Sequence, residues 1–543
     1  MNPTLSFALL GAALALPVCQ AADVEVSVRL AEPDALEVSY QLPPGCDSLP
    51  FVDSSVARAN WAPAGQCGKV EAGALVRTDS ACTALAFRIP AAATFRGYPA
   101  AYPMGAGEGI YLHTSLYAPA DRCGAVHYRF GAPGSIVTGA QAHAGRAALD
   151  GPQAGDTAVL LLQKKLAPSD GALRYFDSRL SPAARAQVAR VADGTAAYLR
   201  KRLPDVPFTQ PALAASIATA PGGPEVNGNG GDLMRLIFFN WPEQPGVDEQ
   251  YKMTLLVAHE MSHRFQLRDA LDGYPSGRLI HEGGAEFLRW MASIGNGWIT
   301  PEQAAQNLDD ELARCMVQVE GRSWGELPQR FISGNTLEYA CGLPALVYAL
   351  AARQGNDTVW SRIGGFYREL RQGKQPDFSR SLECGNDEAC QPRWLPALTG
   401  RQGAMADHWR KLFADTGLAH PREPGPRTRK AILLKAVGQL MEDDCGGHKG
   451  TMDTPQGIFL FGRSECKTLK TNVELRRTEG HPLTGDPAAM PAMAAACAAR
   501  GAVQFESKDG GTLQLSCQRL YRAPDVFYGA DIGKVLARLR DKE

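Results

Sequence analysis

The stretch His259-Glu260-Met261-Ser262-His263, followed after a further eighteen residues by Glu282, decides how this chain is interpreted. Residues 248–267 surround the motif and contain no Pro or Gly, so the pattern predicts a helix there. The apolar stripe of this helix comprises Leu255, Leu256, Ala258, Met261 and Phe265. Because His259 and His263 are four residues apart, their imidazoles lie on one face of the helix.

These residue types at this spacing supply the parts of a zinc site. Two neutral imidazoles and the carboxylate of Glu282 make a three-ligand site with an open position for water. Glu260 lies next to the ligands, where it is placed to accept a proton from that water. Glu286 is one helical turn after Glu282, and we expect it to accept a hydrogen bond from the far nitrogen of a ligand histidine. His281 is interpreted as a residue that lines the site, not as a ligand.

The motif and the segment Leu279-Ile280-His281-Glu282-Gly283-Gly284-Ala285-Glu286-Phe287 together resemble the gluzincin metallopeptidases. The aminopeptidase N and glycyl aminopeptidase families have their third ligand in a similar Glu-Gly-x-Ala context. Thermolysin is similar in its two-histidine helix and its Glu ligand, but its spacing is longer. The resemblance implies one Zn²⁺ ion and the hydrolysis of peptide bonds, with a peptide or protein as the substrate.

A second match lies downstream, in Thr336-Leu337-Glu338-Tyr339-Ala340-Cys341-Gly342. It resembles the Tyr-x-x-Gly segment of those aminopeptidases, in which the Tyr hydroxyl stabilises the oxyanion of the tetrahedral intermediate. The resemblance therefore implies that Tyr339 is the oxyanion donor. The alternative is a core Tyr on a helix that continues through Leu346 and Ala351.

A glycine-rich segment, residues 222–232, precedes the apolar run 233–239. In the family, an edge strand before the zinc helix pairs with the substrate, and in aminopeptidase N a Gly-x-Met-Glu-Asn motif on it binds the substrate's free amine. That motif is absent here, and Glu225-Val226-Asn227 echoes it only in part. Glu225 and Asp232 are the candidates for amine binding, although a glycine-rich turn into a strand explains the segment equally well. The resemblance favours an aminopeptidase, and an endopeptidase stays open.

The composition and the first residues indicate an exported globular protein. The hydrophobic content of 45% and charged content of 21% are ordinary, and a net charge of −1 gives no reason to expect nucleic acid or an anionic membrane surface. Residues 1–22 are typical of a signal peptide, because the apolar run 5–16 is too short to span a bilayer. No later stretch is apolar and long enough for a membrane span. We expect a periplasmic or secreted protein, with lipoprotein anchoring at Cys19 as an alternative.

The cysteines support export. Without Cys19, twelve of the thirteen remain, an even number in local groups, which favours disulfides in an oxidising compartment. Cys384–Cys390 and Cys315–Cys341 are the expected pairs. A structural zinc cluster would need Cys-x-x-Cys spacings, and none occurs.

The chain is expected to be a multidomain α+β protein. Residues 23–155 alternate apolar and polar side chains, which predicts a β-rich domain. Residues 156–424 are predicted to form a thermolysin-like, two-lobed zinc peptidase domain with mostly helices after Glu282. Ser181 and Pro182 are expected to begin a helix that ends near Leu203.

The remaining segment, 425–543, follows a proline-rich linker at 421–426 and is predicted to be a small α+β accessory domain. Glycyl aminopeptidases carry a PDZ domain at this end, so a degenerate PDZ fold is one candidate. A disulfide-stapled structural module is the other. The alternative function for the whole protein is not enzymatic: it would be a peptide-binding protein on a catalytically inactive peptidase scaffold.

Overall fold

The computed structural model describes residues 23–51, 58–92, 99–120, 123–151, 155–168, 171–220, 223–266, 277–355, 357–447 and 450–540. The predicted signal peptide and Cys19 lie outside these residues. Within them, no helix combines the length and the apolarity that crossing a membrane requires. The chain divides into two compact units, Met1–Leu173 and Arg174–Glu543.

The first unit is built on β-strands, as the alternating pattern predicted. Its main sheet runs in the order β4-β7-β2-β1-β10-β12-β9-β8, with β11 beside β10. The apolar residues Val24, Val26 and Val28 of β1 are fully buried between more exposed neighbours. The strands of this unit are β1 (Val24–Glu32), β2 (Ala35–Gln41), β3 (Ser48–Leu49), β4 (Ala62–Pro63), β5 (Gly68–Glu71), β6 (Ala74–Arg77), β7 (Ala84–Pro90), β8 (Tyr102–Met104), β9 (Gly109–His113), β10 (Val126–Thr138), β11 (Gln141–Leu149) and β12 (Ala158–Leu162).

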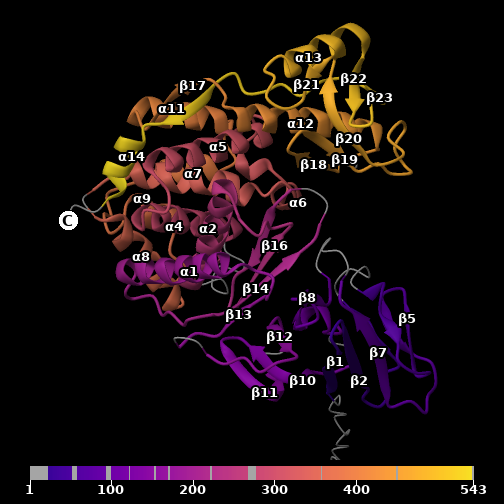
Figure 1. The fold of residues 1–543 in the computed structure, drawn as a ribbon. Coiled ribbons are helices and arrows are strands. Elements are labelled where there is room, and N and C mark those ends of the chain that lie inside the picture. Colours follow the sequence, from indigo (N-terminus) through magenta and orange to yellow (C-terminus); the bar gives the residue numbers. More distant parts are fainter. Residues whose placement is uncertain are drawn as a thin grey trace, which may run out of the picture. The chain divides into compact units, whose positions relative to one another are not determined.

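The second unit begins with a sheet that carries two helices (Figure 1). The sheet order is β13 (Arg174–Phe176), β14 (Ala212–Ala218), β16 (Leu233–Phe239) and β15 (Glu225–Asn229). The first three strands are parallel, and β15 is antiparallel to β16 at the sheet edge. Helix α1 (Pro182–Arg202) starts at Ser181, whose side chain accepts a hydrogen bond from the amide of Ala184, so the predicted cap is confirmed. Helix α2 (Val247–Ser262) carries the zinc motif.

Helices follow α2, as predicted, and share one large core. A π-helical turn, η5 (Leu279–Gly283), leads directly into the first of them. The helices are α4 (Gly284–Gly295), α5 (Pro301–Val319), α6 (Gln329–Gly334), α7 (Leu337–Ala351), α8 (Val359–Arg371), α9 (Phe378–Glu383), α10 (Trp394–Thr399) and α11 (Met405–Thr416). The predicted helices at 300–318, 336–354, 358–373 and 403–417 correspond to α5, α7, α8 and α11.

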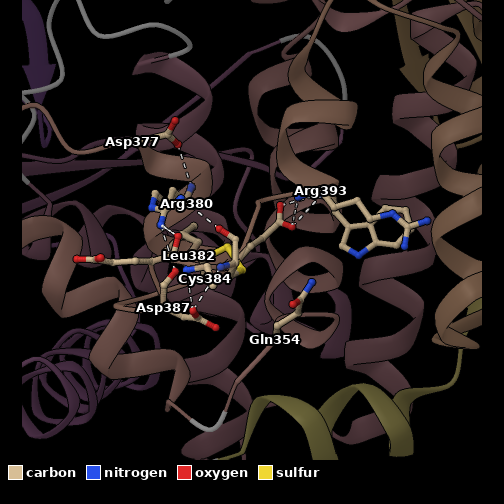
Figure 2. Close-up of a disulfide and its surroundings, with 12 residues drawn as sticks. Gln354, Asp377, Arg380, Leu382, Cys384, Asp387 and Arg393 are labelled. Carbon is tan, nitrogen blue, oxygen red and sulfur yellow. Dashed lines mark hydrogen bonds between the residues drawn. A yellow bond between two sulfur atoms is a disulfide. The ribbon is translucent and has the colours of Figure 1, made fainter.

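Both predicted disulfides are present. Cys315–Cys341 joins α5 to α7, and Cys384–Cys390 closes a tight loop after α9. Figure 2 shows that Arg380 fills this loop, where it donates hydrogen bonds to the carbonyl oxygens of Cys390 and Asp387. The other pairs are Cys46–Cys123, Cys67–Cys82, Cys445–Cys466 and Cys497–Cys517.

The C-terminal segment leaves the helical core and returns to it. Strand β17 includes part of the predicted linker, because it pairs with β24 near the end of the chain. Asp309 of α5 holds this ribbon by accepting hydrogen bonds from the amide of Ala530 and from Arg422. The elements are β17 (Ala419–Arg422), α12 (Pro426–Asp444), β18 (Thr451–Thr454), β19 (Gly457–Leu460), β20 (Val473–Thr478), β21 (His481–Pro482), α13 (Ala489–Arg500), β22 (Ala502–Ser507), β23 (Thr512–Ser516), β24 (Phe527–Ala530) and α14 (Ile532–Leu539).

Strands β18 to β23 form an antiparallel sheet with α12 and α13 packed against it, and the PDZ-like fold of this segment stays a prediction. The last helix, α14, buries Val535, Leu536 and Leu539 in the same core as α7. The end of the chain is therefore part of the structure that supports α5 and α7.

Candidate metal centre

Helix α2 presents both motif histidines at its C-terminal end. The helix is anchored through its buried residues Met253, Val257 and Met261, which pack against the sheet. His259 is only 6% exposed, and His263 follows at the point where α2 passes into a short 3₁₀ turn. Their Nε2 atoms lie 3.1 Å apart, so the two lone pairs face the same point.

Glu282 reaches that point from the π-helical turn η5. One of its oxygens, Oε2, lies 3.5 Å from Nε2 of both His259 and His263. A tetrahedral zinc site with bonds of about 2.05 Å separates its ligand atoms by about 3.3 Å. Oε2 is buried and has no hydrogen-bond partner, which is costly for a carboxylate oxygen unless it binds an ion. The three residues therefore fit a zinc ion.

The buried carboxylate of Glu286 contacts the nitrogen of His259 that faces away from the proposed metal, and the buried guanidinium of Arg289 contacts Glu286. Nδ1 of His259 lies 2.8 Å from Oε1 of Glu286, the residue that the sequence suggested as its partner. Arg289, one turn further along α4, pairs with the other oxygen of Glu286. Burial raises the pKa of Glu286, but Arg289 and His259 outweigh it and lower that pKa to about 2. Burial likewise lowers the pKa of His259, and the carboxylates of Glu282 and Glu286 raise it to about 10.

His263 has an equivalent partner that the sequence did not reveal. Its Nδ1 lies 2.9 Å from Oε1 of Gln266, whose amide group donates to the carbonyl oxygen of His281 at 2.9 Å. With Nδ1 donating to Gln266, the Nε2 lone pair of His263 is free for a metal. The ring of His281 stacks on His263 at a centroid distance of 4.2 Å, beside the three converging groups.

Glu260 lies under the edge strand β15. A Cβ atom on Gly228 would come within 2.5 Å of Oε1 of Glu260, and one on Gly230 within 3.1 Å of Oε2. Only glycine allows the strand to approach this closely. The glycine-rich segment is thus an edge strand that covers a nearly buried Glu260, which is 6% exposed.

Tyr339 stacks against His259. Its ring is 5.5 Å from that of His259, and burial together with the carboxylate of Glu282 raises the pKa of its hydroxyl above the usual value. The helix of Tyr339 touches the turn of Glu282 directly, because a Cβ atom on Gly342 would lie 2.4 Å from the Cα of Gly283. The two glycines thus bring the two motifs together.

Helix α5 fixes the beginning of α7. Thr336, the residue before α7, has φ 51° and ψ 40°, a left-handed conformation that β-branched residues seldom adopt. Arg314 of α5 donates hydrogen bonds to the carbonyl oxygen and to the hydroxyl of Thr336. Together with the Cys315–Cys341 disulfide, this contact holds the first turn of α7, on which Tyr339 lies.

The two candidates for amine binding lie apart from each other. Glu225 is the exposed first residue of β15, three residues before Gly228, so the two positions point to opposite faces of the strand. Asp232 pairs with Arg264 at 2.6 Å, and this cation offsets the charge of its carboxylate. Their role in amine binding stays a prediction.

Comparison with known proteins extends the resemblance to the whole fold. No family model and no curated protein matches the sequence. The fold matches an aminopeptidase N family protein from Idiomarina loihiensis, with a TM-score of 0.59 at 11% identity over 95% of this chain and 100% of that one. Two matches have lower TM-scores. Yeast LTA4 hydrolase with bestatin has a TM-score of 0.41 at 10% identity over 78% of this chain and 72% of that one. A mutant of an M1 zinc metallopeptidase from Deinococcus radiodurans has a TM-score of 0.40 at 14% identity over 70% of this chain and 95% of that one.

The chain therefore has the fold of an aminopeptidase N family protein, and this fold agrees with the resemblance that the motifs carry. The particular fold is the one seen in the Idiomarina loihiensis protein, a mixed α/β architecture with an N-terminal β-rich part and a helical part.

Proposed function

We propose that this protein is a zinc-dependent peptidase of the gluzincin class, with one Zn²⁺ held by His259, His263 and Glu282. The observation that carries the proposal is the convergence of their ligand atoms at separations of 3.1 and 3.5 Å. The fold shared with an aminopeptidase N family protein supports the same class.

A zinc ion held by these residues would act as a Lewis acid, which would polarise the scissile carbonyl and lower the pKa of the attacking water. Glu260 is the general base in this proposal. It takes the proton from the water and passes it to the leaving amine. Its position between α2 and the closely packed β15 keeps the carboxylate in one place, which favours proton transfer along a fixed path.

Tyr339 is the proposed oxyanion donor. The raised pKa keeps its hydroxyl protonated at neutral pH, so the hydroxyl can donate a hydrogen bond to a developing negative charge. Glu286, supported by Arg289, keeps His259 in the orientation that directs Nε2 to the metal.

Within this class, we propose an aminopeptidase, on the basis of the fold match and the family motifs. An endopeptidase of the same fold is the alternative, and the ion pair between Asp232 and Arg264 favours it because an amine needs an unpaired acid. Hydrolysis of one peptide with a free and with an N-acetylated terminus separates the two. Loss of hydrolysis on acetylation supports the aminopeptidase, and equal rates rule out obligate amine recognition.

The rival from another class is a peptide-binding protein on an inactive scaffold. A binder needs neither a general base nor an oxyanion donor, and both Glu260 and Tyr339 are present beside the predicted ligands. Bound zinc without hydrolysis of any member of a broad peptide library would favour the rival.

Glu260→Gln tests the proposed reaction. We expect the variant to keep about one zinc per chain and to lose hydrolysis by a factor of about 10² or more, because the amide cannot accept the proton. Glu243→Gln, at an exposed position before α2, is the matched control and should hydrolyse peptides like the wild type. A fully active Glu260→Gln variant would contradict the assignment.

We also propose that the protein is exported to the periplasm or secreted, with Cys19 lipidation as the alternative. Six disulfides are compatible with an oxidising compartment. Cell fractionation and the mass of the mature N-terminus test this proposal.

A further inference from the structure

Arg278 lies beside the candidate metal centre and has no role in the reaction described above. It is four residues before Glu282, and its Nη2 atom is 3.9 Å from Oε1 of that residue. Its side chain is 55% exposed, whereas the side chain of Glu282 is 11% exposed. Arg278 thus brings an accessible positive charge to the edge of the site.

A buried acid holds this arginine in place. Nε of Arg278 donates to Oε1 of Glu338 at 2.9 Å, and the hydroxyl of Ser333 donates to the same oxygen at 2.9 Å. Glu338 is only 1% exposed, so a peptide cannot reach it. The positive charge of Arg278 acts to lower the pKa of the Tyr339 hydroxyl, so the guanidinium held by Glu338 lies near the proposed oxyanion donor. A guanidinium has five N–H donors, so these contacts leave donors for a further partner.

The guanidinium of Arg278, and not the carboxylates around it, is exposed to a ligand. With Zn²⁺ bound, the ion and Arg278 contribute three positive charges, which balance the three negative charges of Glu282, Glu338 and the proposed base Glu260. These three carboxylates are buried, whereas the side chain of Arg278 is 55% exposed. A fixed guanidinium is also the side chain best suited to bidentate binding of a carboxylate.

We propose that Arg278 binds a carboxylate of the substrate, so that this site prefers peptides with a negative charge within about two residues of the scissile bond. The proposal rests on the proposed function, since it names the substrate class of that same site. The carboxylate comes either from the C-terminus of a short peptide or from an Asp or Glu side chain.

Equilibrium binding to the zinc-loaded Glu260→Gln variant tests the proposal without turnover. The probes are fluorescent peptides in two pairs: one with a C-terminal carboxylate or amide, and one blocked at both ends with an internal Glu or Gln. We expect the charged member of one pair to bind about 10- to 100-fold more tightly, as hydrogen bonds to charged groups imply. The pair that shows the difference identifies the source of the carboxylate.

The same comparison is repeated after Arg278→Met and after Arg330→Met, an exposed arginine on α6. We expect Arg278→Met to remove the preference and Arg330→Met to keep it, with Arg278→Lys in between. If neither pair shows a preference for its charged member, the proposal is overturned. An Arg278→Met variant that weakens both members of a pair equally would also overturn it, because that result assigns Arg278 a purely structural role.

Hydrolysis by the protein with an intact Glu260 separates this proposal from the proposed function. If the charged peptides bind more tightly but no peptide is hydrolysed, the peptidase proposal is refuted and the carboxylate-binding site at Arg278 is still supported. Hydrolysis with equal kcat/KM for the charged and the uncharged member of each pair that is hydrolysed supports the peptidase and refutes the carboxylate site.

Discussion

The contact between Gly283 and Gly342 makes a quantitative prediction for Gly342→Ala. A Cβ atom at position 342 would lie 2.4 Å from the Cα of Gly283 and 3.2 Å from its nitrogen. Carbon atoms normally pack at about 3.5 to 4.0 Å, so α7 and η5 would have to separate by about 1 Å. Both atoms are backbone, so no side chain can rotate to relieve the overlap.

This separation would move Tyr339 away from Glu282, because Tyr339 is one turn before Gly342 and Glu282 directly precedes Gly283. A misplacement of about 1 Å between groups that act on one substrate costs roughly 10²-fold in rate. We therefore expect kcat for a chromogenic peptide to fall about 100-fold. The overpacking should also lower the free energy of unfolding by about 1 to 3 kcal/mol.

The assay measures kcat, the zinc content per chain and the unfolding temperature of the same preparation. We expect zinc to stay near one per chain at saturating zinc, because His259 and His263 are not displaced, and we expect its affinity to fall because Glu282 moves with η5. Gly365→Ala in α8 is the matched control, since no atom lies within 4 Å of the added Cβ. It should keep kcat and gain up to about 1 kcal/mol from the better helix former. A Gly342→Ala variant with wild-type kcat would refute the reasoning.

Three further substitutions test other contacts. Gly228→Ala places a Cβ atom 2.5 Å from Oε1 of Glu260, so kcat should fall roughly tenfold or more with zinc retained; normal turnover would mean that β15 moves aside at no cost. Arg289→Met leaves Glu286 buried without its cation, and zinc affinity in competition with a chromophoric chelator should drop about 10- to 100-fold; an unchanged affinity would contradict the role of this pair. Burial raises the pKa of Asp309 from 3.8 to about 6, so the folded protein holds an extra proton between these values and loses stability from this group as the pH rises. The urea midpoint of wild type relative to Asp309→Asn should therefore decrease from pH 4 to pH 7, and a constant difference would count against a raised pKa.

Sequence periodicity predicted the helices and strands that are determined by residues close to one another in the sequence. The cap at Ser181, the helix of His259 and the alternating strand of Val24 each depend on residues within a few positions of one another. The motif spacing also predicted which side chains meet around Glu282, because family resemblance supplied the tertiary contact that periodicity cannot.

The remaining features depend on contacts between distant segments. Gln266 and Arg289 support the two histidines, yet neither belongs to a pattern that a single sequence reveals. Pro421 was expected in a linker, and it is part of a strand because its partner Tyr528 lies far along the chain. The sequence suggested that Gly228 belongs to a turn. The structure shows that a glycine is needed there because the carboxylate of Glu260 lies against the strand.

The π-helical turn at Leu279–Gly283 has a consequence for how such chains change over time. A π-turn is an α-helix with one residue inserted, and it persists only where something outweighs the weaker packing of the turn. Deletion of a single codon from this turn before Glu282 would let it relax to an α-helix and rotate Glu282 and α4 by about 100° relative to the residues before the turn. The same deletion would preserve every residue type in the motif. Homologues in which the spacing between His263 and Glu282 differs by one should therefore be compared by helical phase, since equal residue counts do not guarantee an equivalent ligand.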